Sequence, residues 1–249
     1  MTDTGHGQLA RLVHRLLDWF YPPHCYHCSK PLAGSENRIL CGSCHQWLAK
    51  TRIGPRRCCI CGFPLPGSSG QEQCINCRLL QPHFSRARAI FSYTGPAATL
   101  VQSYKYQGNY FLGPRLLNLS IAHGWFPKDM GDFDCVIPVP LHPRRRRQRG
   151  YNQATLLARQ LTGSLEKPLL QKALRRTRDT GQQALLSRPK RRENVRGAFA
   201  PGRQSVSGRR VLLVDDVMTT GATAGECAKV LKKEGAHAVM VFTLVAAVK

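Results

Sequence analysis

The clearest hydrophobic pattern in the chain is a series of strand, loop, helix and strand near its C-terminus. The run from Val211 to Val214 is continuous, apolar and rich in β-branched residues, which is typical of a strand buried on both faces. A helical pattern follows from Ala224 to Glu234 and stops at Gly235, and the segment from Ala238 to Leu244 again resembles a strand. This order predicts two parallel strands joined by a right-handed helical crossover, and therefore an α/β fold.

Two further segments extend this pattern. Val136 to Val139 is a short apolar run that stops at Pro140, and it predicts another buried strand. Residues 174–203 are rich in arginine and carry little helical periodicity, so we expect a long polar loop there, which in a compact domain is either functional or disordered.

The chain of 249 residues suits one well-buried α/β domain with a small appendage. Apolar residues recur at helical spacing between Leu9 and Phe20, which predicts an amphipathic helix over residues 1–20. We expect a cysteine-rich module over residues 21–82, followed over residues 83–249 by the α/β domain, with helices on both faces of a parallel sheet. The longest apolar run, Val239 to Val248, is about half of what a membrane span needs, so we expect no transmembrane helix.

Eight of the 11 cysteines form four Cys-x-x-Cys pairs within an internal repeat. An offset of 33 residues superimposes the first two pairs on the last two, and the Pro-Leu-x-Gly-Ser segments at Pro31 and Pro64 on each other. Each repeat has the spacing C-x2-C-x12-C-x2-C, which predicts one tetrahedral zinc site with four thiolates and no open coordination position. The expected ligands of the two structural zinc sites are Cys25, Cys28, Cys41, Cys44, Cys58, Cys61, Cys74 and Cys77.

Alternatives to this metal assignment stay open at the level of sequence. A disulfide framework would suit a secreted protein, but no signal peptide is found at the N-terminus. Spacing alone does not exclude ligation across the two repeats. Cys59, next to Cys58, is an extra thiol that competes for one ligand position.

The charge of the chain indicates an anionic partner. It has 37 Lys and Arg against 14 Asp and Glu, a net charge of +23. The excess is concentrated in residues 134–203, which hold 17 basic and 4 acidic side chains. Such a field attracts nucleic acid, diphosphate esters or anionic lipid without distinguishing among them.

The loop after the C-terminal strand has the composition of a sugar-phosphate site. Thr219 to Thr223 combine small hydroxyl residues with one glycine at the start of a helix, where backbone N–H groups and the helix dipole favour a phosphate. Asp215 and Asp216 precede this loop and would repel a phosphate by themselves. They are explained by a ligand that also carries hydroxyl groups or magnesium.

The 13 residues from 211 to 223 resemble the motif by which type I phosphoribosyltransferases bind phosphoribosyl diphosphate (PRPP). The resemblance implies that Asp215 and Asp216, the expected catalytic residues, hold the ribose hydroxyls of PRPP and its magnesium complex. It also implies that Thr219 to Thr223 hold the 5-phosphate and that a loop over Val139 to Arg149 contacts the diphosphate. The expected PRPP contacts are Lys105, Arg149, Val214, Asp215, Asp216, Thr219, Thr220, Gly221, Ala222 and Thr223.

A wider resemblance covers the chain from about Tyr21 to Val245. It depends on the order of the cysteine module, the PRPP motif and four short motifs between them, which are YKYQG at Tyr104, VIPVPLHP at Val136, RGYNQ at Arg149 and QQALLSR at Gln182. In this order the chain is similar to the ComF family of competence (DNA-uptake) and DNA-utilisation proteins. The resemblance implies a type I phosphoribosyltransferase-like sheet behind a zinc module. It also implies PRPP, single-stranded DNA and proteins of the DNA-uptake machinery as partners, and a cytoplasmic location.

Several functions remain open from the sequence. One is a magnesium-dependent phosphoribosyltransferase linked to DNA uptake or nucleotide metabolism, in which residues 174–203 close over PRPP as a lid. Another is a non-catalytic single-stranded DNA-binding protein whose PRPP site is regulatory or vestigial. For that function residues 174–203 form a nucleic-acid groove, although Phe199 is the only aromatic residue there. An RNA-binding regulator on the same fold has no sequence feature of its own in its favour.

Overall fold

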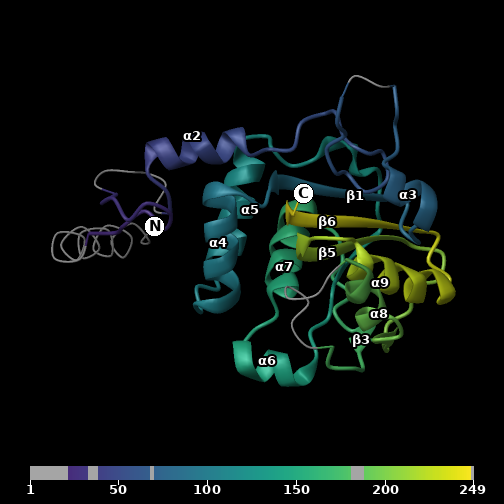
Figure 1. Ribbon diagram of the computed structural model, residues 1–249. Helices are drawn as coiled ribbons and strands as arrows, with labels where there is room; N and C mark the ends of the chain where they lie inside the picture. The colour runs from purple at the N-terminus through teal and green to yellow at the C-terminus, as the bar shows by residue number, and fades with distance from the viewer. Residues whose placement is uncertain (1–21, 33–38, 68–69, 181–187, 248–249) are drawn as a thin grey trace, which may run out of the picture.

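The computed structural model describes residues 22–32, 39–67, 70–180 and 188–247 (Figure 1). The amphipathic helix expected over residues 1–20 and most of the motif at Gln182 lie outside the described residues. Among the described residues, no helix is long and apolar enough to cross a lipid bilayer.

The centre of the fold is a parallel sheet of four strands. Its order is β1 (Arg86–Ser92), β6 (Ala238–Ala246), β5 (Arg210–Met218) and β2 (Cys135–Pro138). All three strand pairs are parallel, and Val214 lies in register with Pro138 on one side and Phe242 on the other. The parallel pair of β5 and β6 confirms the topology that the hydrophobic pattern predicts.

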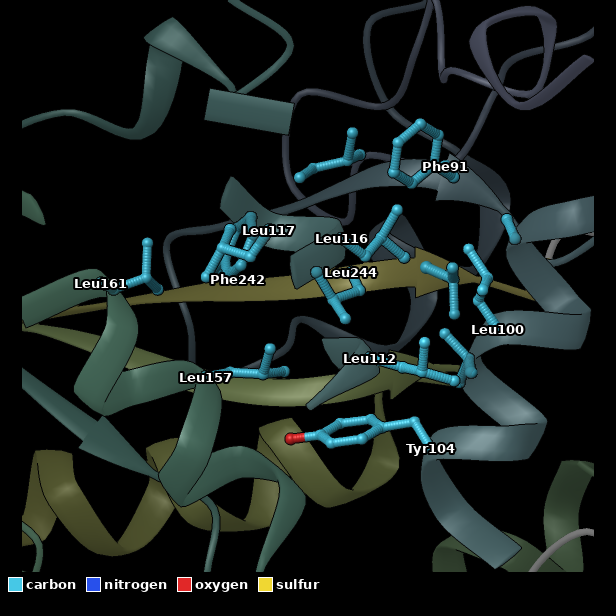
Figure 2. Packing of buried hydrophobic residues seen from close by; sticks show 14 of the residues in the cluster. Phe91, Leu100, Tyr104, Leu112, Leu116, Leu117, Leu157, Leu161, Phe242 and Leu244 are labelled. Atoms are coloured by element: carbon cyan, nitrogen blue, oxygen red, sulfur yellow. The ribbon is translucent and has the colours of Figure 1, made fainter. Parts of the chain in front are cut away.

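Helices cover both faces of this sheet, as expected (Figure 1). On one face, α4 (Gly95–Tyr106), α5 (Leu112–Ala122) and α7 (Gln153–Leu165) pack on Leu212 and Val214 of β5. Figure 2 shows this core, in which Leu100, Leu112 and Leu157 meet Phe242 and Leu244 of β6. On the other face, α9 (Ala222–Lys233) covers the alternate β5 residues Val211 and Leu213. The continuous apolar runs of β5 and β6 are explained by this two-sided burial.

The two cysteine units contact opposite parts of the domain. The first unit ends in α2 (Gly42–Lys50), and its His27 Nδ1 lies 2.8 Å from Thr99 Oγ1 of α4. The second ends in α3 (Ile75–Leu80) and joins the edge of the sheet, where Ala87 of β1 donates a 2.6 Å hydrogen bond from its N–H to the carbonyl of Ile60. The remaining described elements are η1 (Lys128–Met130), α6 (Pro143–Arg149), β3 (Leu174–Arg176), α8 (Arg188–Val195) and β4 (Phe199–Pro201).

Three sequence predictions of local structure are wrong. Strand β5 does not end at Val214, because its pairing with β6 continues to Met218 and Asp215 and Asp216 lie within the strand. The loop expected over Val139 to Arg149 contains helix α6, whose Pro143 occupies the first turn and whose preceding His142 ring accepts the N–H of Arg144.

The third concerns residues 174–203. Strands β3 and β4 of this segment pair antiparallel, with Leu174 opposite Pro201 and Arg176 opposite Phe199, and α8 lies between them. The pairing joins two short stretches that are about 25 residues apart, so no local periodicity reveals it.

Candidate functional site

The cysteines of each repeat come together in one group with the geometry of a four-thiolate zinc site. The sulfur atoms within each group all lie within 4.8 Å of one another. The Sγ atoms of Cys28 and Cys41 are 3.6 Å apart, and so are those of Cys61 and Cys74. A tetrahedral zinc ion with Zn–S bonds of about 2.3 Å places its sulfur ligands about 3.8 Å apart. The arrangement therefore fits zinc, whereas a disulfide requires an S–S distance of about 2.05 Å.

Ligand pairing follows from the same geometry. One group contains Cys25, Cys28, Cys41 and Cys44, and the other contains Cys58, Cys61, Cys74 and Cys77. Pairing within each repeat is confirmed. Cys59 is in neither group, and its N–H instead donates a 2.8 Å hydrogen bond to the carbonyl of Glu72. Four thiolates around each ion leave no position for a substrate, so these centres support structure.

A cavity of about 460 Å³ opens at the carboxyl ends of β2, β5 and β6. This is the edge of a parallel sheet at which ligands of open α/β folds bind. Eight of the ten residues predicted to contact PRPP line it, namely Lys105, Arg149, Asp215, Asp216, Thr219, Gly221, Ala222 and Thr223. Thr220 lines a neighbouring cavity, and Val214 is fully buried in the sheet beneath.

The floor of the cavity is the turn from β5 into α9. Gly221 precedes the first residue of α9 and has a φ of 73°, a conformation that glycine adopts without strain. The Thr220 hydroxyl lies 3.3 Å from the N–H of Ala222 and accepts its hydrogen bond. A 12-residue helix thus points its positive end at the cavity, the arrangement that binds phosphate groups.

The two acids of β5 are held by different contacts. An Oδ1 atom of Asp216 lies 2.9 Å from Nζ of Lys105, which reaches the strand from α4. Burial alone would lower the pKa of Lys105, but Asp216 and Asp215 together raise it, so the lysine stays protonated. An Oδ1 atom of Asp215 accepts the backbone N–H of Asp216 at 2.9 Å. Burial and then the neighbouring Asp216 raise the pKa of Asp215 to about 7.

Two buried donors on the cavity wall have no hydrogen-bond partner among the described residues. They are Nε of Arg176, from β3, and Nε2 of Gln153, at the start of α7. The remainder of each side chain is fixed, since the Arg176 guanidinium lies 5.3 Å over the ring of Phe199 and the Gln153 Oε1 accepts from Arg149 at 3.2 Å. Buried polar groups are nearly always paired in folded proteins. Both donor atoms are closed to solvent, so the cavity wall around Gln153 and Arg176 holds unmet hydrogen-bonding capacity beneath its surface.

Sequence reasoning missed both of these residues as contacts. Gln153 belongs to the RGYNQ motif, so the motif itself was the available signal. Arg176 belongs to residues 174–203, which were expected to close over PRPP as a lid, but no local signal singles it out, because only the pairing of β3 with β4 brings it to the cavity.

A smaller cavity of about 220 Å³ separates the second zinc unit from the turn before α9. Its walls include Cys61, Cys77 and Phe84 on one side and Thr220 on the other. Four residues line both cavities, namely Met218, Thr219, Gly221 and Ala222. The second zinc unit therefore lies behind the turn from β5 into α9.

Comparison with known proteins agrees with a division into a zinc-binding module and an α/β domain. Residues 16–78 match the model of the double zinc ribbon domain, and residues 147–248 match that of the phosphoribosyl transferase domain. The chain is 33% identical over 236 residues to competence protein F of Haemophilus influenzae, covering 90% of this chain and 97% of that protein. It is 33% identical over 226 residues to the DNA utilization protein YhgH of Escherichia coli, covering 90% and 96% respectively.

Among solved structures, the chain is similar to a glutamine PRPP amidotransferase of Bacillus subtilis. The identity is 22%, the match covers 53% of this chain and 26% of that enzyme, and the TM-score is 0.35. The two zinc sites and the phosphoribosyl transferase domain are supported without it, by the family models and the cysteine geometry.

Proposed function

The chain belongs to the ComF family, which includes competence protein F and the DNA utilization proteins, and from that membership we propose that it binds PRPP with magnesium during the use of DNA. The observation that carries the proposal is the set of groups in the 460 Å³ cavity. An acid pair and the turn at the start of α9 face the same space, and two unpaired donors lie buried in its wall. A sugar phosphate with free hydroxyls and a diphosphate matches all three.

Each part of the cavity has a role in this proposal. Asp215 and Asp216 accept hydrogen bonds from the ribose hydroxyls, while the first turn of α9 donates to the 5-phosphate. Lys105, Arg149 and Arg176 supply positive charge for the diphosphate, which PRPP carries together with magnesium. In the free protein, Lys105 forms an ion pair with Asp216. The Asp216 carboxylate therefore lies beside an anion site without repelling the ligand.

Transfer of the phosphoribosyl group would follow from the same arrangement. The bond between C1 and the diphosphate oxygen breaks with its electron pair on the diphosphate. An acceptor nucleophile then bonds to C1 and loses its proton. Fixed positive groups around the departing diphosphate stabilise the charge that develops in the transition state.

A second candidate function is binding without transfer. The net charge of +23 and the names of the relatives favour a protein that handles DNA and uses PRPP as a regulatory ligand. A fold that binds PRPP need not transfer anything. Measuring the release of diphosphate distinguishes the two functions, because only transfer releases it.

The test is a calorimetric titration of the zinc-loaded chain with PRPP and magnesium, followed by an assay of diphosphate release with nucleobases and with DNA strands as acceptors. We expect saturable PRPP binding that needs magnesium. Absence of binding would overturn the proposal. Binding without acceptor-dependent diphosphate would retain the PRPP site and select the regulatory function.

A further inference from the structure

Two exposed aromatic rings lie close to the proposed PRPP cavity, Tyr106 in its lining and Tyr110 against Tyr151. The side chains of Tyr106 and Tyr110 are 59% and 60% exposed, although large aromatic residues usually bury most of their surface. Tyr106 ends α4 and lines the 460 Å³ cavity, and the guanidinium of Arg149 lies 5.2 Å from its ring centroid. The ring of Tyr110 meets the ring of Tyr151 edge-on at 6.2 Å. Both rings are thus held in place and still present their surface to solvent.

Unpaired positive charge lies on α6, the helix whose last arginine covers Tyr106. Helix α6 has the sequence PRRRRQR and no buried residue, and it lies at the lower edge of the molecule in Figure 1. Arg145 and Arg144 share one carboxylate, that of Asp179, at 3.4 and 4.0 Å. Arg146 and Arg147 are exposed and have no ion-pair partner in the part of the chain that the structure describes. The last arginine of the helix, Arg149, is the one that covers Tyr106.

We infer that Tyr106, Tyr110 and α6 form a binding surface for single-stranded DNA at the rim of the PRPP cavity. Bases of the strand stack on the two tyrosine rings, and its phosphates pair with the arginines of α6. Alternation of aromatic faces with basic side chains is the composition of surfaces that bind single strands without sequence preference. A duplex keeps its bases stacked inside, so they do not stack on the tyrosine rings. Only its phosphates contact this surface, through the arginines.

This surface differs from the nucleic-acid groove that one of the two sequence hypotheses placed in residues 174–203. Phe199, the aromatic residue of that segment, is buried and lies beneath the Arg176 guanidinium, so no base reaches its ring. The inference rests on the proposed function, because DNA is the partner in both. It adds that the strand passes the cavity in which PRPP is held.

The central test uses Tyr110→Ala, because Tyr110 does not line the PRPP cavity. Anisotropy of a labelled oligothymidylate of about 20 nucleotides should show about 5- to 150-fold weaker binding, the value of one stacked base. Tyr110→Phe retains the ring and should bind as the wild type does. PRPP affinity of Tyr110→Ala, measured by calorimetry, should be unchanged.

A charge test remains informative if Tyr110→Ala is unstable. Arg146→Gln with Arg147→Gln should reduce the slope of log affinity against log salt by about 0.7 for each lost phosphate contact. Lys229→Gln with Lys233→Gln removes the same charge from α9, on the other face of the sheet, and should leave the slope unchanged.

The outcomes separate the inference from the proposed function. Equal DNA affinity in the wild type and Tyr110→Ala overturns the DNA surface and leaves PRPP binding intact. An equal reduction of the salt slope in the α6 and α9 variants does the same. Equal affinity for duplex and single strand also overturns it, because stacking then contributes nothing. A wild type that binds DNA through Tyr110 but does not bind PRPP rejects the proposed function and retains the surface.

Discussion

Removing the charge of the acid pair tests the proposed ribose contacts most directly. Asp215→Asn with Asp216→Asn keeps the size of both side chains and part of their hydrogen bonding. In the folded chain Asp216 is almost fully buried and holds Lys105 at 2.9 Å. The double variant therefore removes the negative charge of Asp216, and that of Asp215 at a pH above its pKa of about 7, and also frees the ammonium group of Lys105.

The two explanations of the acid pair predict changes of opposite sign. If the carboxylates accept the ribose hydroxyls, losing one charge-assisted hydrogen bond costs about 1.5–3 kcal/mol. PRPP binding should then weaken by roughly ten- to a thousandfold, depending on whether one or both acids are engaged. If the acids only stabilise the free protein, their removal and the release of Lys105 make the cavity more positive, and PRPP should bind more tightly.

The assay is a calorimetric titration with PRPP and magnesium at fixed salt, together with the zinc content and melting temperature of each variant. Asp132→Asn with Glu166→Gln is the matched control, because both side chains are exposed and neither lines the cavity. Tighter or unchanged PRPP binding in the double variant, with the control equal to the wild type, would refute the ribose contacts and leave a general anion site.

Three further predictions concern the metal, the titration of Asp215 and the diphosphate. Metal analysis should find two zinc ions per chain in the wild type and in Cys59→Ser, but only one in Cys58→Ser. Two zinc ions in Cys58→Ser would show that Cys59 is the ligand. Since burial raises the pKa of Asp215 to about 7 from an ordinary value near 4, folding favours its protonated form. Urea unfolding between pH 5.5 and 8 should therefore show the wild type losing stability relative to Asp215→Asn as the pH rises toward 7, and parallel pH profiles would contradict this pKa. Arg176→Gln should weaken PRPP binding by about tenfold or more while leaving ribose 5-phosphate binding nearly unchanged, and an equal loss for both ligands would mean that Arg176 does not contact the diphosphate.

The parts of the molecule that the sequence predicted well are those specified by local pattern. Burial on both faces makes β5 and β6 continuous apolar runs, and Gly235 marks the end of α9. The cysteine ligands follow from spacing, since a Cys-x-x-Cys knuckle brings two thiolates to one ion. Local signals are sufficient here because each feature is formed by residues close together in the chain.

Features that depend on distant contacts were not predictable in this way. The strand β5 extends past Val214 because β6 continues beside it. Without knowledge of this pairing, the pair Asp215 and Asp216 suggests that the strand ends at Val214. Arg176 reaches the 460 Å³ cavity only because β3 pairs with β4 across an intervening helix. Lys105 lies 111 residues before Asp216 in the chain, so their 2.9 Å contact depends on how α4 packs on the sheet.

The proposed DNA surface illustrates why the number of charges in a segment is a poor guide to a binding site. Several arginines of residues 174–203 already have partners in the fold, since Arg178 donates to the carbonyls of Asn194 and Arg196 and Arg175 donates to that of Pro201. A guanidinium engaged in this way must give up or share its hydrogen bonds to bind a phosphate. In helix α6, by contrast, Arg146 and Arg147 are exposed with no ion-pair partner among the described residues, and Arg149 of the same helix lies over the ring of Tyr106. Unpaired charge beside an exposed ring, rather than charge alone, therefore places single-stranded DNA at the mouth of the cavity in our proposal.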